Sequence, residues 1–365
     1  MNAVLRPRSR RRLSRLARHV VSPALFDFWA SRLHPTWSWD RALARVVARR
    51  VESRDSVTLV LAPNRHWRGL QAGQHLNVSA EIDGTRVTRS YSPTRVTGRG
   101  RRIEITVKAI AGGKMSQHLC DPARIGDVLE LGTAFGDMSW PIAAPGGALL
   151  LAAGSGITPL IAMIRASAER GLDAPLTLLY WARCRDELCF VAELRDLAAR
   201  HPAFQVRFVL TREAAAEADE AEGRIDAAQL AHLVSDSDQR AIYACGPGGF
   251  VETARSLLAQ RAPAFLAEAF TPPPSLVDES GTVQLTLAAS RRTLTVARGE
   301  SLLKALESAG IKPPSGCRMG ICNTCACGKR EGSTLHLHNG QVEHEPVSAL
   351  KLCVHSARTD LILDL

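Results

Sequence analysis

Residues 315–325 read S-G-C-R-M-G-I-C-N-T-C, and their three cysteines have the spacing C-x4-C-x2-C. A fourth cysteine, Cys353, follows after a long gap. This is the plant-type arrangement in which four thiolates hold the two irons of a [2Fe–2S] cluster. The short loop of small residues also lets backbone N–H groups turn toward the sulfides. The sequence therefore predicts a one-electron carrier near its C-terminal end, with Cys317, Cys322, Cys325 and Cys353 as the iron ligands.

Two other uses of these cysteines agree less well with the sequence. A zinc site usually pairs two C-x2-C knuckles, and this chain has one. A disulfide framework is not expected in 365 residues with nine cysteines, an odd number, and no secretory signal. Cys327, two residues beyond a predicted ligand, is expected to be a small buried residue outside the coordination sphere.

The net charge of +10 is concentrated at the start of the chain. Residues 1–20 contain seven arginines and no acidic residue, so they account for most of the excess. This pattern indicates a basic tail rather than a nucleic-acid-binding surface, and no nucleic-acid partner is expected. The most apolar segment, residues 146–164, is interrupted by glycine, serine, threonine and proline. Since a spanning helix needs about 20 mostly apolar residues, no transmembrane helix is expected.

The chain divides into four blocks and a linker. Residues 1–40 hold the basic tail and an aromatic segment. In residues 41–143, short β-like runs between turns predict an antiparallel barrel. In residues 144–270, strand–helix alternation predicts a doubly wound α/β domain. Residues 271–275, T-P-P-P-S, form a semi-rigid linker. Residues 276–365 start with a hairpin and a helix, as in a β-grasp-like ferredoxin domain.

Two motifs in the barrel block suit a flavin. Residues 89–93 read R-S-Y-S-P at the end of a predicted strand, where Arg89 and Tyr91 share one face. An arginine fits a phosphate, a tyrosine ring fits a planar heterocycle, and Ser92 adds a hydroxyl group. Residues 112–116, G-G-K-M-S, open a helix and so offer backbone N–H groups to an anion. The alternatives are an ordinary strand end and a plain turn from strand to helix.

Two further turns suit a dinucleotide. Residues 149–159 run from a buried strand through G-S-G into a helix, with Thr158 as the expected N-cap. The full G-x-G-x-x-G fingerprint is missing. Residues 243–250, Y-A-C-G-P-G-G-F, end another strand, and ligands of doubly wound sheets lie at such strand ends. Cys245 is small enough to lie against a nicotinamide; the alternative is a buried residue at a strand end.

These five motifs, in this order over about residues 41–365, resemble the ferredoxin–NADP reductase superfamily. More narrowly, the chain resembles its oxygenase-reductase type, which has a plant-type ferredoxin domain at the C-terminus. The resemblance implies an NAD(P)H-dependent oxidoreductase in which FAD is favoured over FMN, because related G-G-x-x-S turns hold a pyrophosphate. It implies catalytic roles for Tyr91, Ser92 and Cys245. The implied cofactor contacts are Arg89, Tyr91, Ser92, Gly113, Met115 and Ser116 for the flavin, Gly154, Gly156 and Thr158 for the pyrophosphate, and Cys245 and Gly246 beside the nicotinamide.

The choice of nicotinamide coenzyme depends on four residues. Arg183 and Arg185 follow the second strand of the α/β block, and Thr211 and Arg212 follow the third. Members of the family meet the 2′-phosphate of NADPH at these positions, and arginine pairs well with phosphate. NADPH is therefore favoured over NADH. The alternative is that these arginines are solvated surface charges.

The front of the chain bears on the electron acceptor. Residues 26–52 are similar to electron-transfer partners of membrane-bound acyl-CoA desaturases. An arginine-rich tail followed by tryptophan and phenylalanine suits peripheral contact with an anionic membrane. We expect a cytoplasmic reductase, peripheral on the inner face of the membrane, that serves a membrane-bound diiron desaturase or hydroxylase. For residues 1–40, the alternatives are a disordered basic tail with an aromatic segment packed against the barrel, or a transit peptide. For the function, the alternatives are a soluble ring-hydroxylating or other oxygenase as acceptor, and a non-catalytic iron–sulfur sensor.

Overall fold

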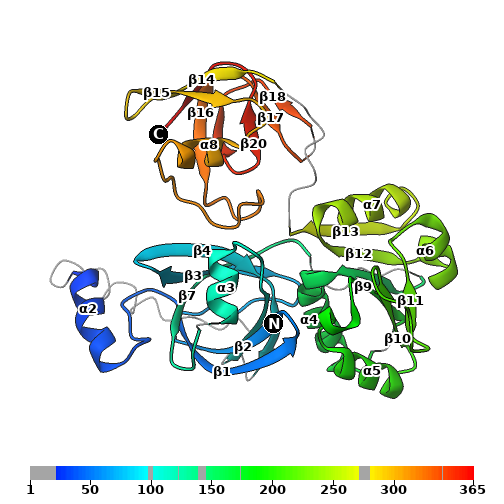
Figure 1. The fold of residues 1–365 in the computed structure, drawn as a ribbon. Helices are drawn as coiled ribbons and strands as arrows, with labels where there is room; N and C mark the ends of the chain where they lie inside the picture. Colours follow the sequence, from blue (N-terminus) through cyan, green and yellow to red (C-terminus); the bar gives the residue numbers. More distant parts are fainter. Residues whose placement is uncertain are drawn as a thin grey trace, which may run out of the picture.

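The structure is a computed structural model, and three bodies are visible in it (Figure 1). The predicted basic tail and the linker at residues 271–275 lie outside the described residues. No helix within the described part of the chain is long and apolar enough to cross a bilayer. The structure describes residues 22–97, 102–121, 123–138, 145–172, 174–270, 280–338 and 340–365.

The first body is an antiparallel sheet of seven strands in the order β4-β3-β7-β1-β2-β6-β5. Its alternating apolar residues surround one core, which includes Leu59, Leu76 and Ile105. Helix α3 (Lys114–Cys120) closes one end of this core with Met115 and Leu119. The strands are β1 (Leu43–Ser53), β2 (Ser56–Pro63), β3 (His75–Ile82), β4 (Thr85–Tyr91), β5 (Pro93–Thr97), β6 (Arg102–Lys108) and β7 (Val128–Phe135).

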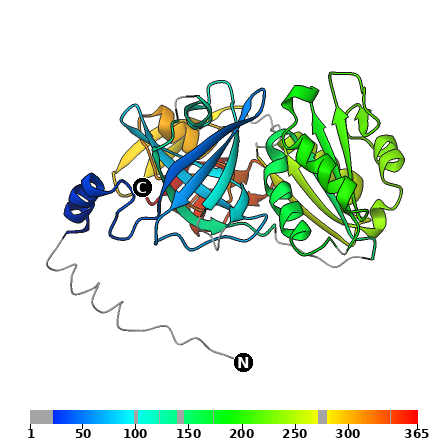
Figure 2. The same ribbon diagram turned by 90° about the horizontal axis from the view of Figure 1, so that it is seen from below.

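A separate helix, α2 (Pro23–Leu33), stands beside the barrel (Figures 1 and 2). Asp27 links α2 to the segment that follows it. The Asp27 carboxylate accepts hydrogen bonds from the Ser38 hydroxyl at 3.0 Å and from the Trp39 backbone N–H at 2.7 Å. Phe26 packs edge-on against Trp39, with 5.3 Å between the ring centroids. One side of α2 is thus tied to the segment that leads into β1.

The second body is a parallel sheet in the order β11-β10-β9-β8-β12-β13. The chain starts at β8, extends the sheet in one direction to β11, then returns to β12 on the other side of β8. The switch point between β8 and β12 is where ligands of such sheets bind. The strands are β8 (Ala148–Ala153), β9 (Leu176–Ala182), β10 (Phe204–Leu210), β11 (Glu220–Glu222), β12 (Ala241–Gly246) and β13 (Ala264–Ala269).

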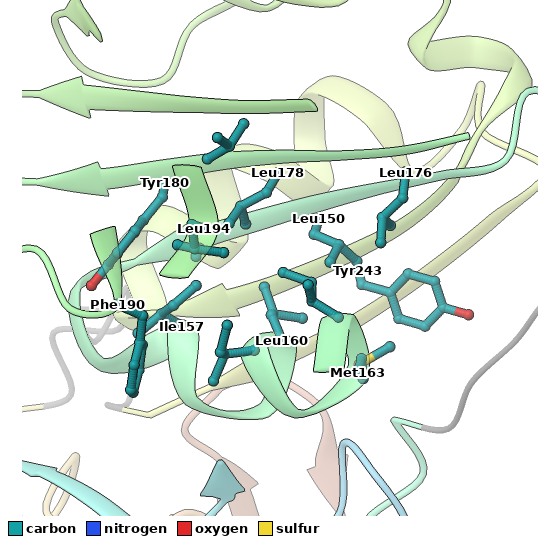
Figure 3. Close-up of a cluster of buried hydrophobic side chains, with 14 of the residues drawn as sticks. Leu150, Ile157, Leu160, Met163, Leu176, Leu178, Tyr180, Phe190, Leu194 and Tyr243 are labelled. Atoms are coloured by element: carbon teal, nitrogen blue, oxygen red, sulfur yellow. The ribbon is translucent and has the colours of Figure 1, made fainter. Parts of the chain in front are cut away.

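Helices cover both faces of this sheet. On one face, Ile157 and Leu160 of α4 and Leu194 of α5 pack against strand residues such as Leu178 and Tyr180 (Figure 3). Helices α6 and α7 contribute to a second core on the other face. The helices are α4 (Ile157–Ala168), α5 (Val191–Arg200), α6 (Ala227–Leu233) and α7 (Gly248–Leu258), and the 3-10 turns are η1 (Gly154–Gly156), η2 (Arg185–Glu187) and η3 (Ser237–Gln239).

The third body combines a mixed sheet in the order β15-β14-β21-β16-β19 with a small sheet, β18-β17-β20. Strands β14 and β21 pair in parallel, and helix α8 (Leu302–Ser308) packs on the same core, which gives the β-grasp-like arrangement. The cysteine loop lies between α8 and β16. The strands are β14 (Thr282–Leu287), β15 (Arg292–Ala297), β16 (Ala326–Glu331), β17 (Thr334–His336), β18 (Val342–Glu343), β19 (Val347–Lys351), β20 (His355–Ala357) and β21 (Leu361–Leu363).

A shielded ion pair and a buried hydrogen bond join the barrel to the α/β body. Lys108 Nζ lies 3.0 Å from the carboxylate of Glu187, whose side chain is 4% exposed. Arg165 of the α/β body, 6% exposed, donates to the backbone oxygen of Thr94 in the barrel at 2.8 Å, and Glu193 of the same body pairs with its guanidinium at 2.6 Å. Because these charges are paired and largely out of water, breaking one partner would leave the other buried and uncompensated. The two bodies are therefore held as one unit.

A candidate site shared by three domains

One cavity of about 930 Å³ is lined by residues from all three bodies. This volume is near the upper end for ligand pockets, which span about 300–1,000 Å³. The cavity therefore joins the predicted flavin site, the predicted nucleotide site and the predicted cluster loop. Its wall includes Arg89, Tyr91, Ser92, Gly113, Met115 and Ser116 from the barrel, Gly154, Thr158, Trp181, Arg183 and Thr211 from the α/β body, and Cys317, Arg318, Met319 and Ile321 from the third body.

The end of β4 forms the flavin side of the cavity. Arg89 and Tyr91 alternate along the strand and therefore share a face, as predicted. Burial raises the pKa of Tyr91, so its phenol stays neutral. Burial and the nearby positive charge of Arg318 lower the pKa of Arg89. The Arg318 guanidinium also donates to the Glu307 carboxylate at 2.8 Å, and Arg89 gives this side of the cavity a positive charge that suits a phosphate group.

The turn before α3 brings three more predicted residues to the cavity. The Ser116 hydroxyl accepts a hydrogen bond from the Ile110 backbone N–H at 3.2 Å and donates to the Gly113 backbone oxygen at 3.1 Å. A Cβ on Gly113 would lie 2.5 Å from Ser116 Oγ, so this tight turn needs glycine. Met115 is buried beneath it. The helix N-terminus is thus open to an anionic group in the cavity.

The nucleotide side begins where β8 ends. Gly154 adopts a positive φ of 53°, and η1 runs directly into α4. The N-cap of α4 is therefore Gly156, and the prediction that Thr158 would be the N-cap was wrong. Thr158 already lies in the first turn, where its hydroxyl donates to the Ser155 backbone oxygen at 3.0 Å. It still lines the cavity.

Cys245 lies behind the cavity wall rather than in it. Its side chain is fully buried at the end of β12, and burial together with the charge of Glu268 raises its pKa. A Cβ on Gly156 would lie 1.9 Å from the Cys245 backbone oxygen, so η1 and β12 are in direct backbone contact there. Gly246 continues this backbone, and its oxygen accepts from the Phe270 N–H at 2.8 Å.

The four residues predicted to meet the 2′-phosphate are in different environments. Arg183 and Thr211 line the cavity, and Arg183 also pairs with the Glu187 carboxylate at 2.9 Å. Arg212 is exposed and is linked to Arg183 by a backbone hydrogen bond of 2.9 Å. Arg185 instead pairs at 2.6 Å with Glu220, whose side chain is 1% exposed, and this hydrogen bond lowers the pKa of Glu220 to about 2. Arg185 thus contributes to the local structure of the loop.

The cavity also contains residues that sequence reasoning missed. His75 of β3 and Glu268 of β13 meet across the two bodies, with 3.3 Å between Nδ1 and Oε1. Their other polar atoms, Nε2 and Oε2, are buried without a hydrogen-bond partner among the described residues. Buried polar atoms normally have partners, so these two fit a polar ligand. Glu268 lies near the end of β13, where ligands of doubly wound sheets bind, and this position was the one sequence signal for it.

The four predicted iron ligands form two pairs. The Cys317 backbone N–H donates to Cys322 Sγ at 3.2 Å, and the Gly320 N–H donates to Cys353 Sγ at 3.2 Å. Hydrogen bonding within the pairs lowers the pKa values of Cys322 and Cys325, and it raises those of their partners Cys317 and Cys353. Backbone donors that point at sulfur suit anionic thiolates.

Each iron of a [2Fe–2S] cluster takes two thiolates, whereas a structural zinc takes four ligands around one ion, so two cysteine pairs suit the predicted pair of irons. Cys327 is buried apart from the pairs, and its thiol contacts the Gly328 backbone oxygen at 3.4 Å.

Comparison with known proteins gives three domain matches. Residues 43–140 match the oxidoreductase FAD-binding domain, residues 150–256 the oxidoreductase NAD-binding domain, and residues 285–356 the 2Fe-2S iron-sulfur cluster binding domain. These matches confirm the predicted fold class and the predicted FAD, NAD(P)H and [2Fe–2S] cofactors.

Similar proteins span most of the chain. An NADPH oxidoreductase of Mycobacterium tuberculosis strain H37Rv is 32% identical over 97% of this chain and 92% of its own. One component of the 1,2-phenylacetyl-CoA epoxidase of Escherichia coli K12 is 30% identical over 82% of this chain and 89% of its own. The solved structure of phthalate dioxygenase reductase superposes with a TM-score of 0.62 at 22% identity, covering 88% of this chain and 97% of that one.

Proposed function

Because the chain belongs to the ferredoxin reductase-type NAD(P)H oxidoreductases that end in a [2Fe–2S] domain, we propose that it passes electrons from NADPH to a membrane-bound diiron desaturase or hydroxylase. The observation that carries this proposal is the cavity that all three domains line. Electron transfer from coenzyme to flavin to cluster needs these sites to be adjacent. A protein with the same cofactors in separate pockets would not support the relay.

The barrel residues hold the flavin in this proposal. Arg89, Gly113 and Ser116 bind its phosphates, since they combine a cation with a helix N-terminus. The neutral Tyr91 ring stacks on the isoalloxazine, and the Ser92 hydroxyl hydrogen-bonds to its edge. When bound, the flavin accepts a hydride from the nicotinamide and releases electrons singly. The protein's contribution is to fix the ring between the nucleotide site and the cluster loop.

The α/β domain holds the coenzyme. Gly154, Gly156 and Thr158 receive its pyrophosphate at the start of α4. Arg183 and Thr211, with Arg212 beside them, are proposed to receive the 2′-phosphate, and the similarity to an NADPH oxidoreductase supports this choice. The buried Cys245 and Gly246 are proposed to shape the wall against which the nicotinamide rests, a positioning role that agrees with their place behind the cavity.

Cys317, Cys322, Cys325 and Cys353 are proposed to hold the cluster, two thiolates to each iron. Residues of the same loop, Met319 and Ile321, line the cavity. A flavin bound in the cavity would therefore lie against the loop that carries the cluster.

The membrane-bound acceptor is proposed on the basis of helix α2. Its outward side chains include Phe28, Trp29 and Leu33, which are 50%, 60% and 78% exposed. Exposed apolar clusters of this kind mark interaction sites. In a membrane, aromatic rings lie at the level of the headgroups and aliphatic side chains enter the edge of the acyl region. These exposed side chains therefore suit the binding of α2 to a membrane surface as an interfacial helix. A docked reductase would share the bilayer with its acceptor.

Vesicle flotation tests this docking in the full-length holoprotein. We expect binding to vesicles with anionic lipid, and we expect Trp29→Ser combined with Leu33→Ser to reduce it at least tenfold. Ile125→Ser is the matched control because its side chain is 69% exposed but belongs to the barrel segment between α3 and β7 and not to α2. Equal flotation of the double variant and this control would contradict the membrane-docking proposal.

A second experiment tests the relay. Cys322→Ser should leave NADPH-driven flavin reduction intact and abolish NADPH-dependent product formation by a co-expressed desaturase. Product formation at the wild-type rate would refute the order flavin, then cluster, then acceptor. A soluble oxygenase is the second candidate acceptor, favoured by the similarity to an epoxidase component, and turnover with such a partner but no vesicle binding would support it. Failure of NADPH to bleach the flavin and cluster would favour a non-catalytic sensor.

A further inference from the structure

A line of hydrogen bonds crosses from the flavin-binding strands to the cluster loop. Ser90 Oγ on β4 donates to Asn77 Oδ1 on β3 at 2.6 Å. Asn77 Nδ2 reaches Thr324 Oγ1 at 3.5 Å. Thr324 Oγ1 then donates to Cys322 Sγ at 3.1 Å. Every donor points the same way, from the barrel toward the sulfur of a proposed iron ligand.

The two domains fit closely at this place. A Cβ on Gly316 would lie 2.8 Å from Cys322 Sγ and 3.2 Å from Asn77 Nδ2, so glycine lets the loop rest against the barrel. The same loop brings Arg318 near Arg89, whose pKa it lowers. In Figure 1 the segment between α8 and β16 extends toward β4. Asn77 is therefore part of an interface and not an isolated contact.

The direction of the hydrogen bonds has an electrostatic consequence. A threonine hydroxyl has one proton to donate, and accepting a hydrogen bond polarises it. When Asn77 donates to Thr324, the Thr324 proton is directed more firmly at Cys322 Sγ. Hydrogen bonds to cluster sulfurs help to set the reduction potential, and they stabilise the reduced form because it carries one more negative charge.

We propose that Asn77 is a positioning residue that raises the reduction potential of the cluster only while the C-terminal domain rests on the barrel. Contact between the domains then favours movement of an electron from the flavin to the cluster. Separation removes the Asn77 contribution, which makes the reduced cluster a stronger donor to the next acceptor. The inference rests on the ligand assignment above but not on the identity of the acceptor.

The test is a spectroelectrochemical titration of the full-length holoprotein. Thr324→Val should lower the cluster potential by an amount on the order of a tenfold change in the ratio of oxidised to reduced cluster, which is about 59 mV for one electron. Thr324→Ser should retain the wild-type value because it keeps the hydroxyl. Asn77→Ala should produce a smaller shift in the same direction. It should produce no further shift in the Thr324→Val background, since Asn77 acts through that hydroxyl.

Ser79→Ala is the control for this titration of the cluster potential. Ser79→Ala alters the same strand, but its hydroxyl bonds to Thr88 at 2.7 Å and not to the cluster loop, so the potential should not change. An unchanged potential in Asn77→Ala, or shifts that simply add in the double variant, would overturn the inference. Asn77 lies outside the C-terminal domain. The Asn77→Ala variant therefore tests the effect of Asn77 on the cluster potential even if Thr324→Val fails to fold. Full iron and sulfide content in Cys322→Ala, whose side chain has no donor atom for iron, would instead refute the ligand assignment.

Discussion

Replacing Gly156 by alanine tests how closely β12 approaches the turn that opens α4. The added Cβ would lie 1.9 Å from the Cys245 backbone oxygen and 2.7 Å from the Gly246 backbone nitrogen. Ordinary van der Waals contact begins at 3.4 Å, so the nearest atoms must separate by about 1.5 Å. Both are backbone atoms of a central strand, and neither can rotate away as a side chain would.

The energetic cost follows from this geometry. Overpacking usually costs about 1–3 kcal/mol, and a backbone clash belongs at the upper end. We expect Gly156→Ala to lower the free energy of unfolding of the α/β domain by about 3 kcal/mol. At about 2–4 °C per kcal/mol, its Tm should fall by roughly 10 °C. NADPH affinity should fall as well, because the displaced turn is the proposed pyrophosphate site.

Scanning calorimetry of the flavin-loaded protein and NADPH titration measure both effects. Gly249→Ala is the matched control for Tm: Gly249 lies at the start of α7, and a Cβ there meets nothing within 4 Å, although the residue lines the cavity. We expect this control to keep the wild-type Tm or to raise it slightly. If Gly156→Ala and Gly249→Ala give the same Tm, the close approach of η1 and β12 is not important for stability, and wild-type NADPH affinity in Gly156→Ala would show that it is not important for binding.

Three further predictions concern individual side chains. Tyr91→Ala should release most of the bound flavin, measured by absorbance after gel filtration; full occupancy would rule out the stacking role. Arg212→Ala should raise KM for NADPH about tenfold or more and leave KM for NADH nearly unchanged, because one charged contact with phosphate is lost. Arg185→Ala, at the ion-paired position, should not change that preference, and equal losses for both coenzymes in Arg212→Ala would exclude a 2′-phosphate contact. The pKa of Glu220 is depressed to about 2, so its stabilising effect is present above about pH 4.5 and is lost as the pH falls toward 2. The difference in Tm between wild type and Glu220→Gln should therefore shrink between about pH 5 and pH 3, and a constant difference would contradict this linkage.

The cluster loop was predictable because its cysteine spacing is contained in one short stretch of sequence. The spacing of Cys317, Cys322 and Cys325 is fixed by the cofactor and visible in eleven consecutive residues. Arg89 and Tyr91 were predictable for a similar reason, since strand periodicity alone places them on one face.

Residues that act across domains were not predictable in this way. His75 and Glu268 meet only because the barrel packs on the α/β domain, and no motif connects positions so far apart in the chain. The role of Arg185 depends on Glu220, which the fold brings to it from another strand. The N-cap of α4 was misplaced at Thr158 because the sequence does not reveal that a 3-10 turn continues directly into the helix.

The shielded charges between the barrel and the α/β domain have a consequence for coenzyme exchange. Glu187 and Arg165 are almost inaccessible to water, so moderate salt will only slightly weaken the Lys108–Glu187 ion pair and the hydrogen bond from Arg165 to Thr94. The cavity between the two domains should then keep its width throughout turnover. The oxidised coenzyme should therefore dissociate without a domain-opening step. Ionic strength should consequently change the rate of association with the electron acceptor much more than the rate at which the coenzyme reduces the flavin.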